Sequence, residues 1–179
     1  MFKHIIDKDL ELRLISMEDS VEFFNLIDKN RKHLREWLPW VDGTKSVEDT
    51  KNFIKSCMNQ YANNNGFHAG IWYKDKIVGI VGLHEVNWNH KNTSIGYWLA
   101  KGFQGKGIMT KACKAVIEHV FINMGLERVE IRCADKNFKS QAIPERLGLV
   151  KEGVCRNIEN LYGNYVNHIV YSALKEEWI

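Results

Sequence analysis

One stretch organises this chain, Gln104-Gly105-Lys106-Gly107-Ile108-Met109-Thr110, and it lies between a strand-like run and a helix-like run. Before it, residues 92–100 alternate between apolar and small or polar side chains, which is the period of a half-buried strand. After it, Lys111, Lys114 and Glu118 fall on one helical face, and apolar residues fill the opposite face. The pattern predicts a strand that passes through a glycine turn into a helix.

Such a turn is suited to binding an anion. The first N–H groups of a helix lack intrahelical acceptors and carry the positive end of the helix dipole. Gly105 and Gly107 would allow the backbone to come close to a ligand. However, the stretch lacks the Lys-Ser/Thr pair of a P-loop, and Thr110 is not the third small residue of a dinucleotide-binding turn. From these residues alone, a tight strand-to-helix connection and a pyrophosphate-binding loop are both open.

The central stretch and three further segments carry a family resemblance. The central stretch resembles the acetyl-CoA loop of GNAT N-acetyltransferases, Gln/Arg-x-x-Gly-x-Gly/Ala, except that Met109 stands at the last position. Residues 137–149 (NFKSQAIPERLGL) resemble the later segment of that family, in which an Asn and a Ser contact the pantetheine arm. Residues 35–40 (REWLPW) and 95–99 (IGYWL) resemble the RimJ/RimL branch, which acetylates the N-termini of ribosomal proteins.

The resemblance implies a fold and a set of cofactor-binding residues. The expected fold is α/β, the GNAT fold: a single mixed, mostly antiparallel sheet of about seven strands, flanked by about four helices. The sheet would be splayed between its fourth and fifth strands to admit acetyl-CoA, and residues 1–179 would form a single domain. The backbone N–H groups of residues 98–100 are the expected donors to the thioester carbonyl. The residues implied to bind acetyl-CoA are Trp98, Leu99, Gln104, Gly105, Lys106, Gly107, Ile108, Met109, Asn137 and Ser140.

Acetyl transfer to an amine needs a base for the amine, a donor for the developing oxyanion and a proton for the leaving thiolate. The resemblance assigns Ser140 as the proton donor and Glu159 as the base, with Glu85 in reserve. A plain helix N-cap is the alternative for Ser140, and an edge polar residue, on the face opposite His84, is the alternative for Glu85. No metal cluster is present in the sequence, and the reaction needs none.

Two tryptophans stand close together in a helix connection. Trp37 and Trp40 either plug the core or form an aromatic lid that binds the substrate, because amphipathic indoles suit partly wet surfaces. The implied function is transfer of an acetyl group from acetyl-CoA to a primary amine, through a ternary complex. The expected acceptor is the N-terminal α-amine of a protein such as a ribosomal protein. A polyamine or aminoglycoside acetyltransferase and a non-catalytic acetyl-CoA-binding module are the alternatives.

The composition limits the class of protein. With 179 residues, of which 45% are hydrophobic and 26% charged, the chain suits one globular domain with a full core. A net charge of +3 is too small to indicate nucleic-acid binding. No apolar segment reaches the roughly 20 residues of a membrane span. The four cysteines form no Cys-x-x-Cys pair, which favours reduced thiols and a cytoplasmic location.

The remaining expectations concern assembly and element boundaries. A homodimer is expected because symmetric dimers are the commonest oligomers and this branch is often dimeric. Glu159 is expected in a loop, 159–164, between the last two strands. Helices are expected at about 16–32, 46–63 and 108–124, with a short one ending at 147 for which Ser140 is a candidate cap. Strands are expected at 10–15, 67–73, 76–88, 92–100, 126–134, 149–158 and 165–173.

Overall fold

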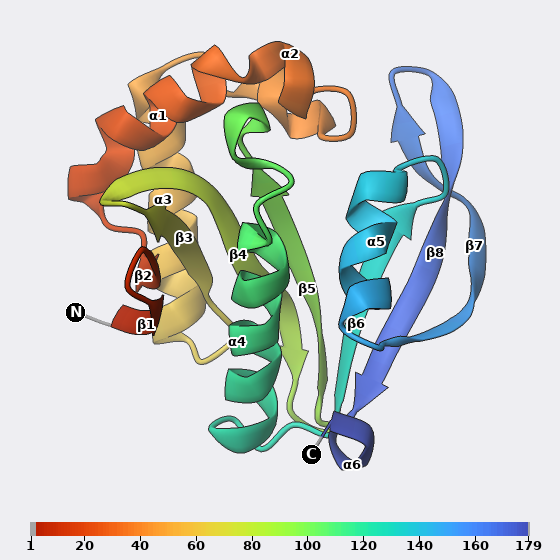
Figure 1. The fold of residues 1–179 in the computed structure, drawn as a ribbon. Helices are drawn as coiled ribbons and strands as arrows, with labels where there is room; N and C mark the ends of the chain where they lie inside the picture. Colours follow the sequence, from red (N-terminus) through yellow and green to blue (C-terminus); the bar gives the residue numbers. More distant parts are fainter. Residues whose placement is uncertain (1–2, 179) are drawn as a thin grey trace.

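The structure is a computed structural model that describes residues 3–178, so Met1, Phe2 and Ile179 lie outside it. Its centre is one sheet with the strand order β1-β2-β3-β4-β5-β6-β8-β7, drawn in Figure 1. All neighbouring strands are antiparallel except β5 and β6. The strands are β1 (Lys3–Asp7), β2 (Leu10–Leu14), β3 (His68–Tyr73), β4 (Lys76–Asn87), β5 (Asn92–Leu99), β6 (Arg128–Ala134), β7 (Val150–Leu161) and β8 (Asn164–Leu174).

Side chains cap the first turns of some of the helices. Ser46 and Asp49 form the capping box that opens α3, as the sequence predicts. The helix expected over 16–32 is divided, because the Ser16–Asp19 box opens a short 3-10 turn before α1 begins. The α-helices are α1 (Ser20–Lys29), α2 (Arg31–Leu34), α3 (Val47–Ala62), α4 (Ile108–Ile122), α5 (Phe138–Arg146) and α6 (Lys175–Trp178). The 3-10 helices are η1 (Met17–Asp19), η2 (Pro39–Gly43) and η3 (Lys101–Phe103).

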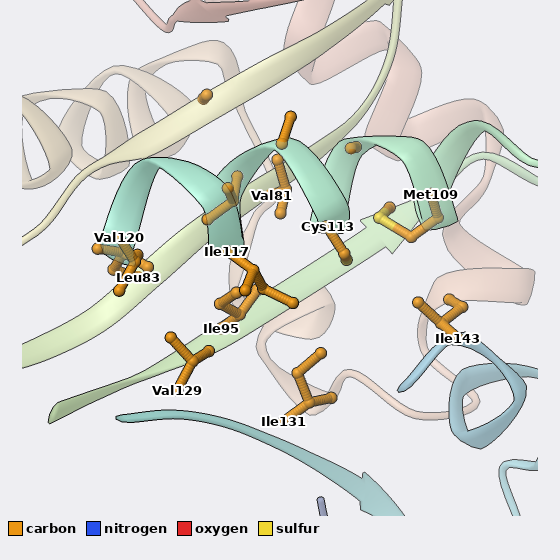
Figure 2. Close-up of a cluster of buried hydrophobic side chains, with 14 of the residues drawn as sticks. Val81, Leu83, Ile95, Met109, Cys113, Ile117, Val120, Val129, Ile131 and Ile143 are labelled. Atoms are coloured by element: carbon orange, nitrogen blue, oxygen red, sulfur yellow. The ribbon is translucent and has the colours of Figure 1, made fainter. Parts of the chain in front are cut away.

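Two apolar cores lie on the two faces of the sheet. The larger one packs α4 against the central strands, and Figure 2 shows part of it, including Val81, Ile95 and Ile117. The smaller one packs α1, α3 and the segment between them against β3 and β4, with Phe23, Ile54 and Trp72 among its members. The predicted α/β architecture is therefore confirmed. Within residues 3–178, no helix combines the length and the hydropathy that crossing a bilayer requires.

The sheet opens between β5 and β6. These two strands pair in parallel only where Asn92–Ile95 meets Arg128–Ile131. Beyond that point, β5 continues along β4 and β6 continues along β8, and the two strands separate. Counted from Leu10, β5 and β6 are the fourth and fifth strands, so the predicted position of the splay is confirmed. The sheet has eight strands because β1, which the sequence analysis missed, adds an edge next to β2.

Candidate functional site

The first half of the site is a groove of about 1560 Å³ beside the N-terminal turns of α4 and α5. Gly107 is the N-cap of α4, with φ of 72°, and Gly105 has φ of 75°. Both angles lie in the left-handed region that glycine adopts most easily. No side chain caps α4, so the first N–H groups of this helix remain available to a ligand in the groove. The predicted strand-turn-helix arrangement is confirmed.

The other residues of the central stretch divide between the groove and its surroundings. The side chain of Met109 is 6% exposed and lies in the core, near Ile143 in Figure 2. A methionine is therefore accommodated at this motif position while its backbone N–H stays in the first turn. The Gln104 side chain lies 3.0 Å from Nε2 of His33. The Lys106 ammonium lies over the ring of Phe103, 5.2 Å from its centroid, and Lys106 is not among the residues that line the groove.

The groove is strongly cationic. Seven of its lining residues are lysine or arginine and one, Glu36, is acidic. Such an excess of positive charge favours a polyanionic ligand. Together with the uncapped helix start, it fits the phosphates of a coenzyme A molecule. The cationic lining residues are Lys29, Lys32, Lys101, Lys111, Lys136, Lys139 and Arg146.

Asn137 and Ser140 occupy the start of α5. Asn137 is the cap of this helix, because its Oδ1 accepts the Ser140 N–H at 3.2 Å. The alternative role of Ser140 as the cap is therefore wrong, and its hydroxyl is available for other contacts. Ser140 Oγ lies 3.3 Å from the Tyr97 hydroxyl and 3.2 Å from Cys133 Sγ. Pro144 lies inside α5 because the helix begins two residues before Ser140.

Tyr97 is a site residue that the sequence analysis missed. Its hydroxyl donates to the Ser140 carbonyl at 3.0 Å, so it joins β5 to α5 across the splay. Burial raises the pKa of Tyr97 well above its ordinary value, and burial also raises the pKa of the Cys133 thiol. Both groups therefore stay protonated near neutral pH. The result is a small cluster of neutral donors around Ser140.

The second half of the site is a cavity of about 1000 Å³, lined by residues from α1, η2, α3 and strands β3 to β8. It meets the groove at the splay, because several residues line both spaces. A ligand in the groove and a second ligand in the cavity would therefore face each other there. The shared residues are Trp37, Leu38, Tyr97, Trp98, Asn137 and Ser140.

One wall of the cavity is aromatic. Trp98 stacks on Phe23 at 5.5 Å between ring centroids and contacts Trp40 at 6.1 Å. Trp40 is 41% exposed, and both Trp37 and Trp40 line the cavity. Their role in binding a substrate remains a prediction, but Trp40 is not a buried core plug. Near this wall, the Arg35 guanidinium lies 4.5 Å from the Tyr162 ring centroid, which joins α2 to the β7–β8 turn.

Both carboxylates singled out from the sequence line the cavity. Glu159 lies within β7, and the expected loop at 159–164 is wrong, because β7 and β8 continue to a tight turn at Tyr162-Gly163. Glu85 and His84 both line the cavity as well, although strict alternation predicts opposite faces. The reason is a bulge, in which β4 has one residue more than β5 between Leu83 and Val86.

Two glycines make room for two histidines on the cavity floor. A Cβ at Gly82 would lie 2.5 Å from Nδ1 of His68, and one at Gly96 would lie 2.6 Å from Nε2 of His84. Burial lowers the pKa of His68 to about 4, while burial and the charge of Arg132 lower the pKa of His84. Both rings are therefore neutral at pH 7. Glycines in the middle of strands were the sequence signal for this arrangement.

Two backbone and side-chain details bear on how the site binds ligands. The Ala100 N–H donates to the Val78 carbonyl at 2.8 Å, so it is not free to bind an oxyanion, contrary to expectation. Backbone alternation turns the Trp98 N–H toward β4 as well, because Trp98 pairs with Ile80 in the same ladder, so Leu99 is the remaining donor of the three. Thr50 lines the cavity, and its hydroxyl is buried without a hydrogen-bond partner among the described residues. A bound substrate or a water molecule can supply that hydrogen-bond partner.

Comparison with known proteins identifies the family. Residues 9–150 match the family described as the acetyltransferase (GNAT) domain. The Bacillus subtilis protein YdaF is 36% identical, over 99% of this chain and 98% of its own. The structure of RimL, a ribosomal L7/L12 α-N-protein acetyltransferase, in complex with coenzyme A is 25% identical, with a TM-score of 0.93 and coverage of 97% and 98%. The microcin C7 self-immunity acetyltransferase MccE, solved with acetyl-CoA and AMP, is 30% identical, with a TM-score of 0.90 and coverage of 94% of both chains. The chain therefore belongs to the GNAT acetyltransferase family.

Proposed function

We propose that this protein transfers an acetyl group from acetyl-CoA to the N-terminal α-amine of a protein, such as a ribosomal protein, in the cytoplasm and as a homodimer. The observation that carries the proposal is the meeting of the two spaces at the splay. Ser140 lines both the cationic groove and the cavity that holds Glu159. The likeness to RimL, a ribosomal-protein α-N-acetyltransferase, supports the choice of acceptor.

The groove residues fit acetyl-CoA. The N–H groups at the start of α4 and the surrounding lysines would hold its phosphates, and Asn137 and Ser140 would contact the arm that leads to the thioester. Bound there, the cofactor supplies an activated acetyl group. The backbone N–H of Leu99, which faces the splay, is the proposed donor to the acetyl carbonyl oxygen.

The reaction balances with two side chains. Glu159, directly or through one water, takes a proton from the acceptor amine, and the amine nitrogen then bonds to the acetyl carbon. The carbon–sulfur bond breaks, and Ser140 gives its proton to the leaving sulfur. The Ser140 hydroxyl donates to the Tyr97 hydroxyl at 3.3 Å, which orients it, and the second proton that the nitrogen loses on forming the amide restores Ser140 through water. Glu85 lines the same cavity and is the alternative base.

The ease of deprotonation favours an α-amine over a lysine. An α-amino group has a pKa of about 8, so freeing its lone pair at pH 7 costs about 1.4 kcal/mol. A lysine side chain, with a pKa of about 10.4, needs about 4.6 kcal/mol. A carboxylate base therefore deprotonates an α-amine more easily than a lysine side chain. We therefore expect lysines in peptides with blocked N-termini to be poor acceptors.

The test is an acetylation assay read by mass spectrometry, with matched peptides whose N-termini are free or blocked. Glu159→Gln should lower kcat/KM on the free peptides, most strongly below pH 8. Glu118→Gln, an exposed site on α4 whose carboxylate pairs with Lys114, is the control. Full activity of Glu159→Gln together with loss in Glu85→Gln would exchange the two roles. Equal rates on blocked and free peptides would refute the N-terminal assignment.

A small amine is the second candidate acceptor. The observation in its favour is the aromatic wall formed by Trp40 and Trp98, since flat rings bind by stacking on such side chains. MccE, which was solved with AMP, adds support. Including polyamines, aminoglycosides and aminoacyl nucleotides in the assay separates these acceptors from peptides. Binding of acetyl-CoA without acetylation of any of them would favour a non-catalytic module.

A further inference from the structure

An irregularity in β7 brings Glu159 to its place. Cys155 lies opposite His168 in the β7–β8 ladder, and the next pair is Glu159 with Val166. Four steps along β7 therefore match two steps along β8, so β7 carries two additional residues. In an unbroken ladder, Glu159 would lie opposite Asn164, about 7 Å further along the strand. The bulge thus carries the carboxylate back toward His168.

One side chain fastens this bulge to the segment that carries the cofactor residues. Asn157, inside the bulge, has φ of 49°, and its N–H donates to Asn167 Oδ1 at 2.9 Å. The amide of Asn167 donates in turn to Asp135 Oδ2 at 2.8 Å, and its backbone carbonyl accepts the Asp135 N–H at 2.9 Å. Asp135 stands two residues before Asn137, the cap of α5. The bulge and the start of α5 are therefore held in one hydrogen-bonded unit.

The bulge places Glu159 against an imidazole. Glu159 Oε2 lies 2.8 Å from His168 Nε2, and both residues line the acceptor cavity. The side chains are 32% and 19% exposed, so the contact is partly shielded from solvent. When the imidazole is neutral and carries its proton on Nε2, it donates to one carboxylate oxygen. The other oxygen then remains free to face the cavity.

We propose that His168 is a positioning residue for Glu159, and that the bulge held by Asn167 fixes the position of this carboxylate–imidazole pair in the acceptor cavity. This inference rests on the proposed function. The neutral ring orients the carboxylate, whose free oxygen takes the proton from the acceptor amine.

Other charged groups share this cavity. Glu130 and Arg132 reach it from β6, His84 and Glu85 from β4, and His68 from β3. Glu130 forms ion pairs with Arg128 and Arg132, at 2.6 and 2.8 Å, which offset its charge. Asp135 accepts a hydrogen bond from Asn167, the residue that precedes His168. Because all of these groups are retained in a His168 variant, the ratio of variant to parent isolates the contribution of His168.

The experiment compares His168→Gln and His168→Leu with the parent, using a free-N-terminal peptide from pH 5.5 to 9. Glutamine keeps an N–H donor near the position of Nε2, whereas leucine keeps none. His168→Leu should lose about 10- to 100-fold in kcat, with the KM of the peptide and the Kd of coenzyme A within threefold. His168→Gln should stay within about fivefold of the parent, because its amide can replace the N–H donor to Glu159.

Two controls keep the outcome decisive. His90→Gln, on the exposed turn after β4, should behave as the parent at every pH. Asn167→Ala should lower kcat as His168→Leu does, because the bulge loses its fastening; circular dichroism checks that each variant is folded. A loss of kcat in His168→Gln as large as that in His168→Leu, or full kcat in His168→Leu, overturns the inference. If Glu159→Gln keeps full activity, the proposed base itself is wrong, and that result is distinct from a failure at His168.

Discussion

Gly96 offers a sharp test of how the acceptor cavity is built. A Cβ at this position would lie 2.6 Å from Nε2 and 2.8 Å from Cε1 of His84. Comfortable contact between such atoms begins at about 3.5 Å, so the His84 ring in Gly96→Ala must move by about 1 Å. The ring also holds Ser94 Oγ at 2.9 Å from its Nδ1, and a shift of that size breaks this hydrogen bond.

The expected stability change is the sum of two opposing effects. Losing the His84–Ser94 hydrogen bond costs about 1 kcal/mol. Alanine in a strand recovers roughly 0.5–1 kcal/mol relative to glycine, because it loses less backbone entropy. Gly96→Ala alone should therefore change the free energy of unfolding by less than about 0.5 kcal/mol. In a His84→Ala background, where no ring blocks the Cβ, the same change should stabilise the protein by that 0.5–1 kcal/mol.

The assay is a double-mutant cycle by urea denaturation, with a coupling energy of about 1 kcal/mol expected. Gly102→Ala is the control, because a Cβ there meets nothing within 4 Å. The displaced ring should also raise the KM of the acceptor, while calorimetry should find the affinity for coenzyme A unchanged. Additive effects of Gly96→Ala and His84→Ala would refute the reasoning, because they would show that the ring and the glycine do not depend on each other.

Three further predictions address the groove, the proton donor and the floor of the cavity. Gly107→Asp should abolish coenzyme A binding in calorimetry, while Gly107→Asn, which differs only in charge, should retain part of it; equal binding by both folded variants would show that the start of α4 is not the anion site. Ser140→Ala should slow turnover more than it weakens coenzyme A binding, and a loss confined to affinity would make Ser140 only a cofactor contact. The lowered pKa of His68, about 4 against an ordinary 6.5, means that its contribution to stability is full above pH 6.5 and is lost as the pH falls toward 4. Between pH 6.5 and 4, the free energy of unfolding measured in urea should therefore fall by up to about 3 kcal/mol less in His68→Gln than in the parent. The same pH dependence in both proteins would contradict this account.

Features that depend on local pattern were predictable from the sequence. The alternation over 92–100 and the glycines before Ile108 predicted a strand, a turn and a helix, and each is present. The capping box at Ser46 predicted the start of α3 within one residue. In each case the signal lies within a few neighbouring residues, and the packing of the core agrees with it.

Features that depend on pairing between strands were not predictable. The bulges at His84-Glu85 and before Glu159 change which way side chains point, yet they follow from the register with a neighbouring strand. The Tyr97–Ser140 contact joins residues 43 positions apart and exists only because the sheet opens between them.

The cap of α5 was not predictable for a different reason. Asn137 caps this helix, but asparagine and serine are both good caps, so the sequence does not choose between Asn137 and Ser140.

The splay also gives the sheet two edges that face inward. After β5 and β6 separate, residues 96–99 and 132–134 each lack a strand partner on one side, although they lie in the middle of the molecule. Strand edges at the outer rim of a sheet invite pairing with other chains and lead to aggregation. Here each free edge faces the opposite half of the sheet, and α4 and α5 flank the opening in Figure 1. The protein can thus keep unpaired backbone groups for a slender, extended ligand without offering them to the strands of other proteins.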